Sequence, residues 1–142
     1  MILFERSFVH PPPRVWQAMV DPDLWSLQTN GFRPEVGCKY RITHPAIMGT
    51  RLLGTGHCTV VAADPGELLA VEFTGAVRAG DPAHWTISHS LAALDGGTTL
   101  TTYLDGVDFN DHSEKVLLRV VTDSTARSLH VLQERLNRTT GC

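Results

Sequence analysis

The sequence predicts an α+β protein in which a curved antiparallel sheet wraps around one long C-terminal helix. Consecutive strand-like segments, separated by short turn signals, run from residue 38 to residue 104 and indicate an antiparallel meander. Residues 110–137 contain neither Pro nor Gly, as expected of a single long helix. A third observation, a triple proline followed by helical spacing, adds one or two short helices after the first strand.

The N-terminal region changes from strand to helix at Pro11, Pro12 and Pro13. Residues 1–10 are rich in Phe, Val and Ile, which indicates a strand. Proline suits the first turn of a helix, because its missing N–H would have no partner there. Apolar residues at i, i+4 spacing then predict a helix over residues 14–20, and a second helical turn is expected around Leu24 and Trp25.

Five further segments complete a predicted sheet of six or seven strands. Their turn signals are Asp-Pro-Gly at residues 64–66 and Asp-Gly-Gly at residues 95–97, where Gly accepts a positive φ. Irregular structure is expected over residues 31–37 and 45–54. The five predicted strands cover residues 38–44, 55–63, 68–77, 84–94 and 98–104.

The long C-terminal segment begins with a capping box and carries an interrupted apolar stripe. Asp111 and Glu114 have the spacing of the capping box, which places the helix over residues 110–137. Two small hydroxyl residues, Ser124 and Ser128, fall in the middle of the stripe, so either the helix approaches the sheet closely there or a space opens. The apolar stripe consists of Leu117, Val121, Leu132 and Leu136, flanked by Leu118, Leu129 and Val131.

Polar residues on the predicted inward face of the sheet favour a cavity. His89 alternates with Trp85, Ile87 and Leu91, and Thr102 lies between Leu100 and Leu104, so both point inward; His44 does so by the same logic. An apolar chamber with a few convergent polar groups is typical of a small-molecule site. The candidate ligand-binding residues are His44, Tyr40, Phe73, Trp85, Thr102, Ser124 and Ser128.

His89 is the candidate for chemistry, because histidine can act as a general acid or base near neutral pH. The alternative is a buried, hydrogen-bonded histidine without a catalytic role. His57 and Cys58 are neighbours, so they face opposite sides of a strand and cannot form a thiol–imidazole pair.

Composition and charge narrow the classes of function. The chain has 142 residues, a net charge of −3 and a pI near 6.1, so it lacks the basic excess of a nucleic-acid surface. Three cysteines without a CxxC spacing predict reduced thiols, and no disulfide framework or structural zinc. The first residues do not resemble a signal peptide, and no apolar run approaches the roughly 20 residues of a membrane span. A cytoplasmic location is expected.

No metal or cofactor is expected. Asp105, Asp108, Asp111 and His112 crowd one loop, but a turn followed by a helix cap accounts for them. The sequence contains no Ser-His-Asp order, phosphate-binding glycine loop or zinc signature.

The segment of residues 8–16 (FVHPPPRVW), the hairpin of residues 94–100 (LDGGTTL) and the order of elements resemble the START/Bet v 1 helix-grip (SRPBCC) superfamily. The similar branches are the polyketide cyclase/dehydrase-like and the AHSA1-like proteins, although residues 124–128 lack the Gly-Trp often found in the AHSA1-like helix. The resemblance implies one START-like ligand-binding domain over residues 1–142, with a hydrophobic cavity under the long helix.

Three functions follow from these observations and this resemblance. The first is binding of a small hydrophobic or aromatic metabolite, as a carrier, sensor or sequestering protein that is a monomer or homodimer. The second is a metal-free cyclase or dehydratase with His89 as acid or base. The third is a protein-interaction domain. The absence of a recognisable acid–base pair in the sequence favours binding.

Overall fold

The computed structural model describes residues 1–21, 28–43, 52–77, 80 and 82–140. Within them, two helices accompany one antiparallel sheet of seven strands in the order β1-β7-β6-β5-β4-β3-β2. The helices are α1 (Pro12–Met19) and α2 (His112–Thr140). The strands are β1 (Ile2–Phe8), β2 (Gln28–Asn30), β3 (Lys39–Thr43), β4 (Leu52–Asp64), β5 (Leu68–Val77), β6 (His84–Leu94) and β7 (Gly97–Asp105).

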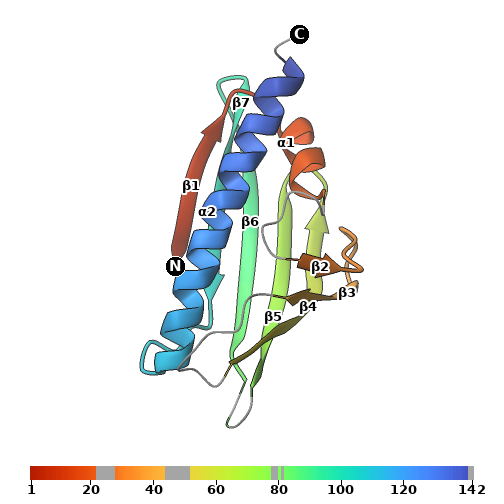
Figure 1. The fold of residues 1–142 in the computed structure, drawn as a ribbon. Helices are drawn as coiled ribbons and strands as arrows, with labels where there is room; N and C mark the ends of the chain where they lie inside the picture. The colour runs from red at the N-terminus through yellow and green to blue at the C-terminus, as the bar shows by residue number, and fades with distance from the viewer. Residues whose placement is uncertain (22–27, 44–51, 78–79, 81, 141–142) are drawn as a thin grey trace.

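Strands β2 to β7 form a meander, and β1 forms the edge of the sheet next to β7. Each strand from β2 to β7 pairs with its neighbour in sequence, and β1 returns to pair with β7. Figure 1 shows α2 running along the sheet over β6 and β7, with α1 beside the C-terminal half of α2. The curved sheet and the long helix confirm the predicted α+β helix-grip architecture.

Most predicted boundaries agree with the structure, and one strand was missed. β5 and β6 begin and end where the sequence placed them, whereas β4 begins at Leu52 rather than at residue 55. The short edge strand β2 was not predicted, because three residues are too few to show an alternating pattern. The expected helical turn at Leu24 and Trp25 lies outside the described residues.

The hairpin between β6 and β7 has the turn that its sequence predicts. Asp95 and Gly96 both adopt positive φ, at 49° and 81°, as a two-residue type I′ turn requires. Gly97 then allows close contact with β1, because a Cβ at this position would collide with the carbonyl oxygen of Phe8. The turn and this glycine together position β7 between β6 and β1.

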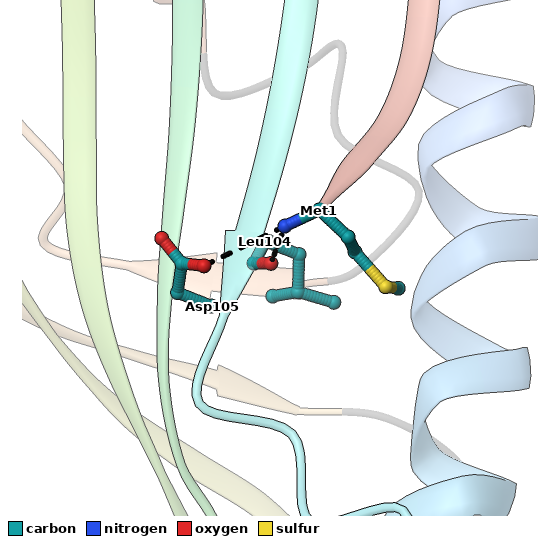
Figure 2. Close-up of polar contacts among 3 residues, drawn as sticks. All are labelled: Met1, Leu104 and Asp105. Atoms are coloured by element: carbon teal, nitrogen blue, oxygen red, sulfur yellow. Dashed lines mark hydrogen bonds and ion pairs between the residues drawn. The ribbon is translucent and has the colours of Figure 1, made fainter.

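The first residue extends the ladder between β1 and β7 (Figure 2). The ammonium nitrogen of Met1 donates a hydrogen bond to the carbonyl oxygen of Leu104 at 2.8 Å. It also lies 3.5 Å from Oδ1 of Asp105. That carboxylate is largely exposed, so the ion pair contributes little to stability.

Hydrogen bonds hold the long helix to β6 at its start and to the segment between β1 and α1 near its end. Near its start, the backbone N–H of Glu114 donates to Oδ1 of Asp111 at 3.1 Å, which is half of the predicted capping box. The Glu114 carboxylate instead accepts hydrogen bonds from Nε1 of Trp85 at 2.7 Å and from the backbone N–H of Asp108. Near its end, Asn137 Oδ1 lies 3.3 Å from His10 Nε2.

The side of α2 that faces the sheet matches the predicted stripe, with one exception. Leu117, Val121, Leu132 and Leu136 are buried, as are Ser124 and Ser128 between them. Val131 was predicted to flank the stripe, but it is 40% exposed because it lies on the outer side of the helix. No helix in the described part of the chain has both the length and the apolar character to span a membrane.

Candidate ligand cavity

A cavity of about 90 Å³ lies between the sheet and α2. Its walls are mostly apolar, and they come from four strands, from α2 and from Phe32 in the segment before β3. The lining residues are Phe32, Tyr40, Ile42, Cys58, Leu69, Val71, Phe73, Ile87, His89, Val121, Ser124, Thr125 and Ser128. Of the two arrangements that Ser124 and Ser128 left open, close packing or a space, the structure has a space lined by both layers.

Small residues on both layers keep this space open. Ser124 and Ser128 occupy helix positions where larger apolar side chains would extend toward the sheet. On β4, a Cβ at Gly56 would collide with the ring of Phe73. The glycine therefore allows the Phe73 ring to lie against β4, where it forms part of the wall.

Five of the eight candidate site residues line the cavity. Tyr40, Phe73, His89, Ser124 and Ser128 do so. The remaining candidates are Trp85 and Thr102, which are fully buried but lie outside the lining, and His44, which is outside the described residues.

His89 is held by the neighbouring strand. Its Nδ1 atom lies 2.9 Å from Oγ1 of Thr102, its register partner on β7, and the two form a buried hydrogen bond. Burial lowers the pKa of His89 from 6.5 to about 4, because the charged imidazolium would lose its hydration. The imidazole is therefore neutral at pH 7 and contributes a polar but uncharged group to the wall.

Trp85 supports the site from the protein interior. Its Nε1 hydrogen bond to Glu114 connects β6 to the first turn of α2, and its ring lies 5.9 Å from that of Phe73, centroid to centroid. Trp85 therefore has a structural role, because it helps to position the ring of Phe73 in the cavity wall.

Tyr40 and Cys58 form the polar part of the wall on β3 and β4. They are register partners, and a side-chain hydrogen bond joins them. Burial and the nearby Cys58 thiol raise the pKa of Tyr40 above its ordinary value. Burial likewise raises the pKa of Cys58 to about 11, so both groups are neutral at pH 7. Cys38 and Cys58 are free, as predicted, whereas Cys142 lies outside the described residues.

We expect Cys58 to react slowly with alkylating reagents while the protein is folded. A pKa of about 11 makes the thiolate at pH 8 on the order of 100-fold scarcer than in a peptide thiol, and burial restricts access further. Iodoacetamide labelling, followed residue by residue by peptide mass spectrometry, measures this rate, and the protein in denaturant is the control. Native and denatured rates that agree would contradict the buried environment.

Several wall residues were missed from the sequence, for two different reasons. Ile42, Val71, Ile87 and Val121 follow the inward periodicity and could have been found by extending each predicted face. Phe32 could not, because it lies in irregular structure, where its ring packs edge-on at 5.1 Å from that of Tyr40.

The acidic residues at the start of α2 take part in local hydrogen bonds. Oδ1 of Asp108 accepts from the backbone N–H of Asn110 at 2.9 Å, and Asp111 caps the helix. Their carboxylates and that of Glu114 lie within 4.8 Å of one another. Turn and cap geometry accounts for the cluster, and the expectation that no metal binds there stays a prediction.

A curved antiparallel sheet, a long helix across it and an apolar cavity between them define a helix-grip protein. The family model for Activator of Hsp90 ATPase homolog 1-like (AHSA1) protein matches residues 9–137, and the chain belongs to this family. This match favours the AHSA1-like branch over the cyclase-like one.

Solved structures share the fold at low sequence identity. Protein MLL2253 from Mesorhizobium loti is 24% identical, with a TM-score of 0.73 over 98% of this chain and 97% of that one. Protein Ms6760 from Mycobacterium smegmatis is 20% identical, with a TM-score of 0.65 over 95% and 89%. DynU16, from the dynemicin biosynthetic locus, is 19% identical, with a TM-score of 0.65 over 94% of this chain and 46% of that one. No curated protein matches the sequence.

Proposed function

We propose that this protein binds a small hydrophobic or aromatic metabolite between the sheet and α2, and acts as a carrier, sensor or sequestering protein. The observation that supports this most directly is the apolar cavity lined by both layers, with a few polar groups in its wall. We further propose that residues 1–142 form a single ligand-binding domain and that the protein is located in the cytoplasm.

The volume of the cavity limits the size of the ligand. Pockets for drug-sized molecules usually measure roughly 300–1,000 Å³. An engineered apolar cavity of about 150 Å³ accommodates benzene. At about 90 Å³ this cavity is smaller than that, so a single ring is the largest ligand that it favours, and the wall must move to admit one.

Catalysis by His89 is less well supported than binding. A general base works best when its pKa is near the working pH. The lowered pKa of His89, about 4, makes its imidazole a weak base at pH 7. No Asp or Glu side chain lines the cavity among the described residues, so a carboxylate partner for His89 is not found there.

Toluene provides the test of binding, because it is neutral, apolar and contains a single ring. A ligand that binds only the folded protein raises the midpoint of thermal unfolding as its concentration increases. We expect such an increase with toluene, and saturable changes in the NMR signals of cavity methyl groups such as those of Val71 and Val121. If these signals and the midpoint do not change up to the solubility of toluene, the proposal fails and an interaction-surface role becomes the better explanation.

A further inference from the structure

A second, smaller cavity adjoins the first. It measures about 20 Å³, and its apolar lining comes from α1, β7 and the C-terminal half of α2. Three residues, His89, Thr125 and Ser128, line both cavities. The residues that line only the smaller cavity are Met19, Leu100, Leu129 and Leu132.

The three shared residues form a polar partition between two apolar chambers. Each of them carries a group that can both donate and accept hydrogen bonds, depending for His89 on the tautomer. Hydrogen bonds that these groups make within the protein can be exchanged for bonds to a ligand at small net cost. The partition therefore offers partners to the polar part of a bound molecule. The walls of the larger chamber, which are apolar apart from Tyr40, Cys58 and Ser124, contact its apolar part.

The walls favour an uncharged ligand. Among the described residues, neither cavity is lined by Lys, Arg, Asp or Glu. The titratable lining residues Tyr40, Cys58 and His89 are neutral at pH 7. A carboxylate or ammonium group would lose its hydration without meeting an opposite charge, and this is costly in an apolar interior.

We infer that the ligand is an uncharged single-ring molecule with one hydroxyl or carbonyl group, whose ring occupies the larger chamber and whose polar group contacts His89, Thr125 and Ser128. This inference rests on the proposed function and narrows its ligand class. The smaller chamber has room for about one water molecule, which needs roughly 10–15 Å³, and such a water can bridge the polar group to the partition.

Three ring compounds test the ring, the polar group and the absence of charge. Toluene has a ring without a polar group, phenol adds a hydroxyl, and benzoate carries a negative charge. In the wild-type protein at pH 7, we expect phenol to bind at least as tightly as toluene although phenol is better hydrated, because the partition replaces its hydrogen bonds to water. Benzoate is expected to bind at least 100-fold more weakly than phenol. Heteronuclear NMR titrations of the intact protein measure all three dissociation constants.

The variant Ser128→Ala tests the partition directly, since it removes one hydroxyl and adds no bulk. We expect its affinity for phenol to fall by about 3- to 10-fold, while its affinity for toluene changes little. Ser113→Ala is the matched control, because Ser113 is also a buried serine of α2 but lines neither cavity. Its affinities for both compounds are expected to equal those of the wild type.

The outcomes distinguish this inference from the function on which it rests. If toluene binds but phenol binds more weakly, or benzoate binds as well as phenol, the inference is overturned and the binding function stands. Equal loss of phenol and toluene affinity in Ser128→Ala would also overturn it. If none of the compounds binds, the proposed function fails, and the inference fails with it.

Discussion

Replacing Ser128 by leucine is expected to abolish binding of toluene while leaving the fold intact. Ser128 lines the cavity from the helix side, and a leucine there replaces a hydroxyl with a branched hydrocarbon that extends into the space. Filling an apolar cavity recovers about 24 cal/mol per Å³, so a complete fill of about 90 Å³ would stabilise the protein by up to roughly 2 kcal/mol. Imperfect fit reduces this gain. We expect a thermal midpoint equal to or above that of the wild type, and at least a 10-fold weaker affinity for toluene.

Arg127→Leu is the matched control for this substitution. Arg127 is the preceding residue and lies on the exposed side of α2, so the same leucine there does not enter the cavity. Toluene binding to this variant is expected to match the wild type. If Ser128→Leu unfolds the protein, the helix is packed tightly against the sheet at this position, and the cavity assignment is wrong there.

The second large effect is a loss of stability in mild acid caused by His89. In the unfolded chain this imidazole binds a proton below pH 6.5, but in the folded protein only below about pH 4. Between these values the unfolded chain binds more protons, so the free energy of unfolding falls as the pH decreases. The contribution of His89 to the free energy of unfolding is fully present above pH 6.5 and is lost progressively as the pH approaches 4. The gap between the two pKa values corresponds to roughly 3 kcal/mol at most.

His89→Gln isolates this contribution. Glutamine is polar but does not titrate, so the free energy of unfolding of this variant is expected to depend less steeply on pH between 6.5 and 4 than that of the wild type. Urea unfolding at several pH values measures the difference in slope, and the other histidines contribute equally to both proteins. His57→Gln makes the same substitution at an exposed position of β4 and serves as the matched control. Parallel slopes for the wild type and His89→Gln would show that His89 is not neutral and buried.

The architecture could be predicted from the sequence because its signals are local. The turn at Asp95 and Gly96, the alternation around His89, and the uninterrupted helical segment each depend on neighbouring residues. β2 could not be predicted in this way, because its strand character arises from pairing with β3 rather than from its own three residues.

The candidate site was predictable in part. Alternation within a strand identified the inward side chain of His89, and Tyr40 and Phe73 were also correct candidates, but alternation could not distinguish cavity wall from core. Trp85 and Thr102 point inward as predicted, yet each makes a buried hydrogen bond instead of facing the cavity. Distinguishing these cases requires knowing where α2 crosses the sheet, and that depends on packing between segments far apart in sequence.

The position of bound toluene tests most directly whether the ligand site lies between the sheet and α2. Nuclear Overhauser effects between the toluene ring and protein methyl groups report which side chains surround the ligand. If toluene binds between the sheet and α2, effects are expected to Val71 on β5 and to Val121 on α2, because these residues line the cavity from the sheet and the helix. Effects confined to exposed apolar side chains, such as Val61 and Leu94, would contradict a binding site between the sheet and α2.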